Sequence, residues 1–250
     1  MLAEERFRRI LDILNRQHTA GIAELAAQIG TSESTIRRDI ATLDQAGRLR
    51  RIYGGAMALQ PQVLTIEEDV ETKREKNVPE KDLIARYAAQ AIHNDDFVFI
   101  DAGTTTFRML EYINAPGAAY MTNGIAHAKT LLKKGYKTII TGGEIRLKTD
   151  AIVGTDCIAC LQRYNFTKCF MGANGIDIQC GYTTPDPEEA HVKTEVIRRS
   201  YVAYVLADHT KFHRVSSVTF AGLKTACILT DRLEDPTFHQ HTVIKEIKEL

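Results

Sequence analysis

No run of apolar residues in the sequence approaches the ~18 that a membrane-spanning helix requires, so we expect no membrane partner. The chain also lacks an excess of charge, because 32 Lys and Arg are balanced by 32 Asp and Glu. A generally basic surface for nucleic acid is therefore excluded. The five cysteines are odd in number and scattered, which argues against a disulfide framework and favours a reducing, cytoplasmic compartment. Residues 1–18 mix charges with an amphipathic apolar spacing and do not resemble a signal peptide.

The sequence gives little support for a metal site. Cys157 and Cys160 form a CxxC pair, but Cys169 and Cys180 lie apart, and no histidine completes a zinc-finger spacing. The pair falls inside a predicted helix, whereas a redox CxxC would begin one, so we expect packed thiols. We expect neither a metal nor a cofactor.

The N-terminal segment 19–56 has the pattern of a DNA-binding unit. Ile22, Leu25 and Ile29 recur at helical spacing, and a second helix buries Ile36 and Ile40. Its opposite face and the basic hairpin that follows carry hydroxyls and arginines, which suit phosphates and base edges in the major groove. The predicted DNA contacts are Ser32, Ser34, Thr35, Arg37, Arg38, Arg48, Arg50 and Arg51.

A small helical bundle with a solvated arginine face is the alternative for this segment. Helix-turn-helix spacing alone is weak evidence, and the basic hairpin at this offset favours a winged helix-turn-helix. Residues 1–60 hold nine Arg, no Lys and seven acidic residues, a net charge of only +2. DNA affinity must therefore come from local arrangement and from doubling the domain in a homo-oligomer, a dimer or tetramer.

The rest of the chain predicts an α/β domain. Residues 57–79 hold two prolines and many charges, and read as a linker with a short helix near 67–76. From residue 80, short apolar strands alternate with helices, which indicates a mostly parallel sheet wrapped by helices. The expected domains are 1–56, a linker over 57–79, and 80–250. The expected strands are 97–101, 119–122, 138–142, 168–173, 203–208 and 226–231, and 242–247 is a further candidate strand.

Small polar residues follow these strands, where parallel sheets bind ligands. The sharpest case is Asp101–Thr106, in which a Gly-containing turn and three threonines open a helix, a setting that favours a phosphate. It lacks the spacing of a nucleotide P-loop or a dinucleotide fold. Each loop alone reads as a cap or tight turn, but five at one sheet edge predict a site for a small phosphorylated polyol. The predicted effector residues are Asp101, Gly103, Thr104, Thr105, Thr106, Asn123, Gly124, Gly143, Asn174, Glu189, Lys193 and Lys211.

These motifs together resemble the DeoR-type bacterial repressors of sugar metabolism. The resemblance begins with SESTIRRDIATLDQAGRLRRIYGGA and continues through DAGTTT, TNG, GGEIR, GANGID, TTPDPEEAHVK and LADHTKF. The run GYTTPDPEEAHVK with YVLADHTKF looks most like the fructose-operon repressors of that family. The resemblance implies operator DNA as partner and fructose 1-phosphate as effector. It also implies a C-terminal domain similar to ribose-5-phosphate isomerase.

The isomerase pattern can be laid on this chain loop by loop. Its phosphate loop falls on Ala102–Thr106 and its lysine on Lys211, while two aspartates are replaced by Met171 and Asn174. Its general-base glutamate falls on Thr194, with Glu195 adjacent, and aldose–ketose isomerisation needs a positioned carboxylate. The resemblance therefore implies a repressor that keeps the phosphate grip and has lost the proton-transfer group. The alternative is a sugar-phosphate isomerase or hydrolase with an accessory DNA-binding module.

Overall fold

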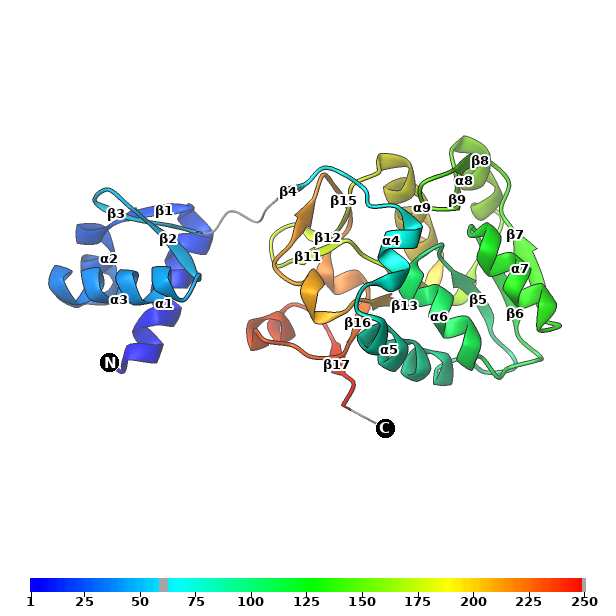
Figure 1. The fold of residues 1–250 in the computed structure, drawn as a ribbon, viewed down its shortest axis with the longest axis horizontal. Helices are drawn as coiled ribbons and strands as arrows, with labels where there is room; N and C mark the ends of the chain where they lie inside the picture. The colour runs from blue at the N-terminus through cyan, green and yellow to red at the C-terminus, as the bar shows by residue number, and fades with distance from the viewer. Residues whose placement is uncertain (59–62, 249–250) are drawn as a thin grey trace. The chain divides into compact units, whose positions relative to one another are not determined.

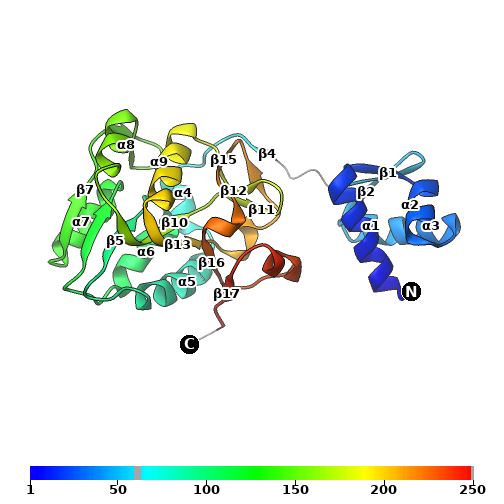
Figure 2. The same ribbon diagram turned by 180° about the vertical axis from the view of Figure 1, so that it is seen from behind.

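The chain divides into two compact units, Met1–Pro61 and Gln62–Leu250, in a computed structural model that describes residues 1–58 and 63–248 (Figures 1 and 2). Each unit has its own hydrophobic core. The two units can therefore carry separate functions.

The N-terminal unit is a winged helix-turn-helix, as the sequence predicts. Apolar residues at helical spacing, among them Ile10, Leu25, Ile36 and Ile40, meet in one core that is almost fully buried. The Ser32 hydroxyl accepts a hydrogen bond from the Thr35 amide at 3.3 Å and so caps the second helix of the motif. The elements are α1 (Ala3–Gln17), β1 (Thr19–Gly21), α2 (Ile22–Ile29), α3 (Glu33–Gln45), β2 (Leu49–Ile52) and β3 (Gly55–Ala58).

The wing has one strand more than the predicted hairpin. β1, which the sequence analysis did not predict, pairs antiparallel with β3, and β3 pairs with β2. A Cβ atom at Gly55 would lie 2.2 Å from the Ala20 carbonyl oxygen, so glycine is needed for this close pairing. The base of the wing is thus tied to the start of α2.

The C-terminal unit is built on a seven-stranded sheet in which every neighbouring pair is parallel. In spatial order the strands are β17 (Ile244–Glu246), β16 (Cys227–Thr230), β13 (Ser200–Leu206), β10 (Phe166–Gly172), β5 (Phe97–Ile100), β6 (Ala119–Thr122) and β7 (Lys137–Ile140). The parallel α/β fold expected from the sequence is therefore confirmed.

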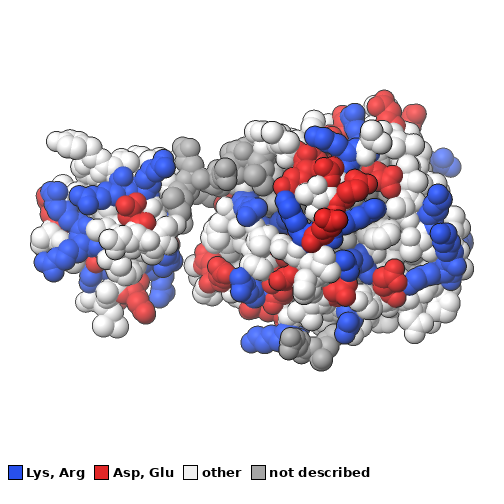
Figure 3. All heavy atoms as spheres, viewed as in Figure 1, with Lys and Arg blue, Asp and Glu red and all other residues white. Residues whose placement is uncertain are grey.

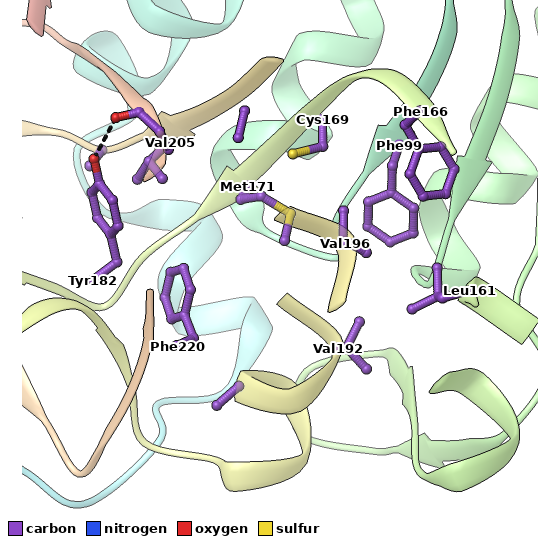
Figure 4. Close-up of a cluster of buried hydrophobic side chains, with 14 of the residues drawn as sticks. Phe99, Leu161, Phe166, Cys169, Met171, Tyr182, Val192, Val196, Val205 and Phe220 are labelled. Carbon is purple, nitrogen blue, oxygen red and sulfur yellow. Dashed lines mark hydrogen bonds between the residues drawn. The ribbon is translucent and has the colours of Figure 1, made fainter. Parts of the chain in front are cut away.

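The side chains of alternate residues on the central strands pack into two hydrophobic cores, one on each face of the sheet. Val98 and Ile100 contact the core with α5 and α6, whereas Phe99 contacts the core with α8 and α9. Figure 4 shows part of this second core, where Phe99, Phe166 and Met171 pack near Val192 and Val196. The five larger helices are α5 (Val78–Gln90), α6 (Thr104–Tyr112), α7 (Ile125–Lys133), α8 (Thr155–Leu161) and α9 (Pro187–Arg198).

Short strands outside the seven-stranded sheet complete the unit, and the sequence analysis did not find them. Strands of two to four residues are too short to show a period of two, so sequence patterning has little to read in them. They form the hairpin of β8 (Glu144–Arg146) and β9 (Ala151–Val153), the three-stranded sheet of β11 (Gly175–Asp177), β12 (Gly181–Thr184) and β15 (Val218–Ala221), and the parallel pair of β4 (Val63–Leu64) with β14 (Val215–Ser216).

The chain changes direction across the sheet between β5 and β10. It runs outward from β5 through β6 to β7, returns to β10 beside β5, and then runs outward the other way through β13. The carboxyl ends of β5 and β10 therefore border a topological switch point, where open α/β sheets bind ligands. Asp101 follows β5 and Gly172 ends β10 at this crevice.

The expected linker over 57–79 is too long, because most of it belongs to the second unit. β4 pairs with β14, the Val70 amide donates to the Lys148 carbonyl at 2.9 Å, and α4 (Val70–Glu75) leads into α5. Residues 59–62, which the prediction also covered, lie outside the described residues. Three charged residues of this segment, Glu68, Lys73 and Lys76, line the cavity described next.

Candidate functional site

A cavity of about 670 Å³ opens at the switch point of the sheet, a volume typical of small-molecule sites. Its walls come from the residues after β5, β6 and β10, from α9, and from the segment 65–77 with the start of α5. Among the predicted effector residues, it is lined by Asp101, Gly103, Thr104, Thr105, Asn123, Asn174, Glu189, Lys193 and Lys211.

A buried ion pair holds the floor of this cavity together. Lys193 Nζ on α9 lies 2.5 Å from Asp101 Oδ2 and 3.0 Å from the Gly172 carbonyl oxygen. Asp101 also accepts hydrogen bonds from the amides of Gly103 and Gly172, at 3.0 and 2.7 Å. Burial opposes the charge of Asp101, but Lys193 and these donors outweigh it and lower the pKa of the carboxyl below its usual value. The pair thus joins β5, β10 and α9 at one point.

The loop after β5 presents a helix N-terminus to the cavity. Gly103 is the N-cap of α6, and Thr104 and Thr105 form its first turn on the cavity wall. The first N–H groups of a helix have no partner within it, and the helix dipole there favours an anion. Together with the two threonine hydroxyls, this makes a suitable seat for a phosphate group.

Several lysines converge on the same space. Lys73 on α4 and Lys81 on α5 line the cavity with Lys193 and Lys211. Burial lowers the pKa of Lys73 to about 8, with Glu189 opposing and Lys211 and Lys193 adding to the shift. Burial likewise lowers the pKa of Lys81 to about 8, and Lys211 contributes. Such crowded cations are stabilised by a bound anion.

Acceptors for hydroxyl groups stand beside these cations. Asn123 donates through Nδ2 to the Ile152 carbonyl at 3.0 Å, while its buried Oδ1 accepts from none of the described residues. The buried Oε1 of Glu189 is likewise without a donor among the described residues. Buried acceptors are normally satisfied, so both atoms suit the hydroxyl donors of a polyol.

Three predicted effector residues do not reach the cavity. Thr106 is fully buried, and its hydroxyl donates to Asp101 Oδ1 at 2.8 Å. Gly124 packs against His127, whose ring nitrogen Nε2 lies 3.1 Å from the Gly103 carbonyl oxygen and supports the loop from behind. Gly143 has a φ of +124° and approaches the Val153 carbonyl, so its glycine serves the backbone. All three support the site from outside its wall.

Sequence reasoning missed the polar side chains that α4, α5 and the turn between them contribute. Lys73, Lys76, Asn77 and Lys81 line the cavity, although their segment was taken as linker or helix face. Arg214, beyond Lys211, was missed as well. The clustering of four basic residues in 73–81 was a usable signal, but the interspersed acids made it look like a solvated helix surface.

The positions matched to isomerase acids do not form a proton-transfer site. Met171 lies fully buried in the core (Figure 4), and the Thr194 hydroxyl donates to the carbonyls of Ala190 and Phe220. Glu195 does not line the cavity, and instead pairs with Arg198 and Arg199 at 2.7 and 2.9 Å. The cavity does contain another carboxylate, that of Glu189.

The exposed face of α3 and the wing carries the predicted DNA contacts. Arg37, Arg38, Arg48, Arg50 and Arg51 are all exposed. On the visible face of this unit in Figure 3, patches of arginine and fewer acidic groups lie among uncharged residues. The Arg37 pair with Glu33, at 3.2 Å, is more than half exposed and therefore weak, so it leaves Arg37 available to DNA. Ser34 is exposed and Thr35 half-buried beside the Ser32 cap.

A further ion pair fixes the orientation of α3, and the sequence analysis did not identify it. Arg6 on α1 contacts both carboxylate oxygens of Asp39, at 2.5 and 2.9 Å. Asp39 lies on the buried side of α3 and is only 5% exposed. A bidentate pair of this kind sets the angle at which α3 projects its arginines.

The described residues contain no group of three or more His, Cys, Asp or Glu side chains arranged to hold a metal ion. Cys157 is fully buried in α8, where burial raises the pKa of its thiol. Within the part of the chain that the structure describes, no helix is long and apolar enough to cross a membrane.

Comparison with known families identifies both units. Residues 6–62 match the DeoR-like helix-turn-helix domain, and residues 76–232 match the DeoR C terminal sensor domain. The chain is 38% identical over 252 residues to the uncharacterized HTH-type transcriptional regulator FruR of Bacillus subtilis (strain 168), covering 99% of this chain and 100% of the relative. It is 30% identical over 241 residues to the lactose phosphotransferase system repressor of Staphylococcus aureus (strain MRSA252), covering 94% of each chain.

Solved structures give a weaker likeness. Ribose 5-phosphate isomerase A of Methanocaldococcus jannaschii matches with a TM-score of 0.40 and 12% identity over 55% of each chain. The eIF2B delta protein of Chaetomium thermophilum matches with a TM-score of 0.41 and 16% identity, over 59% of this chain and 57% of that one.

We predict that the cavity binds a phosphorylated polyol more weakly as the pH rises above 8. Lys73 and Lys81, each with a pKa of about 8, bind an anion only when protonated. The affinity for the anion is therefore highest well below pH 8, where both lysines are protonated. Above pH 8 it falls by about tenfold per pH unit for each lysine that must gain a proton. Calorimetric titration with glycerol phosphate from pH 7.5 to 10 measures this, because a phosphate ester with a second pKa of about 6 keeps its charge over that range.

The matched control is Lys73→Arg, since arginine stays charged throughout and should flatten part of the slope. An affinity that is independent of pH in the unaltered protein would show that these lysines do not hold the ligand.

Proposed function

This chain belongs to the DeoR family of transcriptional regulators, and we propose that it represses a sugar-utilisation operon under the control of a sugar phosphate. The winged helix binds operator DNA, and the C-terminal unit binds the effector. The observation that carries this proposal is the cavity at the switch point. There a helix N-terminus and lysines suited to a phosphate lie near acceptors that have no donor among the described residues and suit hydroxyls.

We further propose fructose 1-phosphate as the effector. The run GYTTPDPEEAHVK with YVLADHTKF resembles the fructose-operon repressors, and the similarity to FruR agrees with that choice. Thr104 and Thr105 would seat the phosphate with Lys211 as countercharge, and Asn123 and Glu189 would accept from sugar hydroxyls. No other cofactor is part of the proposal.

A homo-oligomer is part of the same proposal. The N-terminal segment has a net charge of only +2, so one copy offers little non-specific attraction to DNA. Two winged helices on adjacent half-sites would multiply the contacts without a more basic surface. The effector acts by favouring one arrangement of these heads over another.

The C-terminal unit, in this proposal, binds its sugar phosphate without turning it over. The Thr194 hydroxyl donates to backbone carbonyls and Glu195 pairs with arginines, while Met171 is buried in the core. The enzyme alternative, an isomerase or hydrolase with a DNA-binding module, retains one argument, the Glu189 carboxylate in the cavity.

We predict that Arg37→Ala or Arg38→Ala weakens operator binding by ~1–3 kcal/mol if the arginine reads a base. A phosphate contact would instead weaken all DNA alike and flatten the salt dependence. Fluorescence anisotropy on operator and scrambled DNA at several salt concentrations separates these cases. Arg163→Ala, which removes an exposed arginine from the other unit, is the control. If both variants bind as the unaltered protein does, α3 is not the recognition helix.

We predict that Lys211→Ala abolishes most of the thermal shift given by the sugar phosphate and leaves operator binding intact. Lys211 Nζ forms only a long ion pair with Asp208 Oδ2, at 3.9 Å, and Lys211 lines the cavity. Its ammonium group can therefore also contact a phosphate. Loss of one charge-assisted contact should cost ~1.5–3 kcal/mol of binding free energy.

The measurement is a thermal-shift titration with a panel of sugar phosphates, in which a true ligand raises the melting temperature by mass action. Lys224→Ala, an exposed lysine outside the cavity wall, should behave as the unaltered protein. A normal response of Lys211→Ala to fructose 1-phosphate would move the site elsewhere. A response to another sugar phosphate alone would change only the choice of sugar.

We predict no isomerisation of ribose 5-phosphate or fructose 1-phosphate, even at saturating ligand. Loss of a general base removes roughly 10²–10⁴-fold of rate and can leave residual turnover, so the assay must be sensitive. Deuterium exchange at the sugar carbon, followed by NMR over hours, meets this need. Exchange above the buffer rate that disappears in Glu189→Gln would establish an enzyme that uses that carboxylate.

A further inference from the structure

Residues 65–77, which we call the strap, form one wall of the cavity. Thr65, Ile66, Glu68, Val70 and Lys73 of this segment line it. The strap begins directly after β4, and its α4 helix is capped by Asp69, whose carboxylate accepts from the Thr72 amide at 2.7 Å. It is therefore part of the C-terminal unit, and it begins three residues after that unit starts at Gln62.

The strap places a carboxylate among the groups that would hold the effector. Glu67 accepts hydrogen bonds from Asn174 Nδ2 at 3.1 and 3.3 Å, and it forms an ion pair with Lys73. Its side chain is only 9% exposed. Asn174 follows β10 at the switch point and is itself on the cavity wall. A buried carboxylate is costly unless its site supplies cations and donors, and this site supplies both.

The surroundings of Lys73 indicate what this carboxylate replaces. Lys73 is close enough to Glu189, Lys193 and Lys211 for their charges to affect it. These are the groups expected to meet the sugar phosphate. Glu67 does not line the cavity itself, but its negative charge engages Lys73 and Asn174, two side chains of the cavity wall that an anionic ligand would contact.

We propose that Glu67 is a built-in competitor of the effector, and that its displacement couples the cavity to the DNA-binding unit. This inference rests on the proposed function, because it takes the sugar phosphate as the ligand. A ligand that takes Lys73 and Asn174 releases Glu67 and frees residues 65–69. These residues begin four positions after Pro61, the last residue of the N-terminal unit. The ligand therefore has different affinities for two arrangements of the strap, which is what allosteric control requires.

Ligand affinity tests the competition directly. If Glu67 holds Lys73 and Asn174 about nine-tenths of the time, it lowers the apparent affinity for the ligand about tenfold. Glu67→Gln should therefore bind the sugar phosphate roughly tenfold more tightly. Glu67→Ala should bind at least as tightly. The matched control is Glu71→Gln, which removes the same charge four residues away on α4. Glu71 is exposed and does not line the cavity, so the affinity of this variant for the sugar phosphate should change little.

Operator binding tests the coupling. In the unaltered protein, fructose 1-phosphate should change the operator Kd. Glu67→Gln should show, without ligand, the operator Kd of the ligand-bound protein, and adding ligand should then change it less than twofold, roughly the spread expected for uncoupled sites. Hydrogen exchange in residues 65–70 should accelerate when ligand binds the unaltered protein, as the Val70 amide loses its bond to Lys148.

The outcomes separate the two levels of the proposal. If the unaltered protein binds no sugar phosphate of the panel, the proposed function fails. If it binds one, but Glu67→Gln binds that ligand no more tightly or keeps the full operator response, only the competitor fails. Slower exchange in residues 65–70 on ligand binding would likewise overturn it, since the strap would then be closing on the ligand.

Discussion

The buried ion pair between Asp101 and Lys193 is the interaction on which the C-terminal unit's site depends. It joins the end of β5 to α9. Asp101 also accepts a hydrogen bond from the amide of Gly172 at the end of β10. These are the two strands that border the switch point of the sheet. Without the lysine, the carboxylate would be a buried charge with no cation beside it, which is strongly destabilising. The loop that begins α6 would also lose the anchor that aims its amides into the cavity.

This arrangement separates positioning groups from binding groups. Thr106 and His127 hold the loop from inside the protein, and Asp101 is fully engaged by its neighbours. Thr104 and Thr105 remain on the cavity wall. In the N-terminal unit, the pair of Arg6 with Asp39 has a similar positioning function, because it fixes α3 while Arg37 and Arg38 stay exposed. In both units a buried carboxylate orients a surface that is left open to a ligand.

The sequence predicted the fold well because its main signals are local. Helical spacing of Ile36 and Ile40 and the apolar run Phe97–Ile100 each determine one element, and alternation of strands and helices indicates a parallel sheet. The strand ends also predicted seven of the residues on the cavity wall, since parallel strands place their carboxyl ends at one edge, and two more, Glu189 and Lys193, come from α9.

The rest depended on contacts between distant residues, which spacing does not encode. Thr106 follows Thr105 directly in the first turn of α6, yet its hydroxyl is directed to Asp101 and not to the cavity. Lys73 and Lys81 sit in a charged stretch that matches a solvated helix equally well, and only the packing of α4 and α5 brings them inward. The strap was taken for linker for a similar reason: the two-residue strand β4 that precedes it has too little pattern to reveal its pairing with β14.

A crystal structure of the protein with the sugar phosphate that gives the largest thermal shift tests the central claim most directly. The account predicts phosphate oxygens within about 2.7–3.2 Å of the Thr104 and Thr105 amides, with Lys211 alongside and sugar hydroxyls donating to Asn123 and Glu189. A phosphate bound away from the start of α6, or a ligand outside the crevice between β5 and β10, would contradict it.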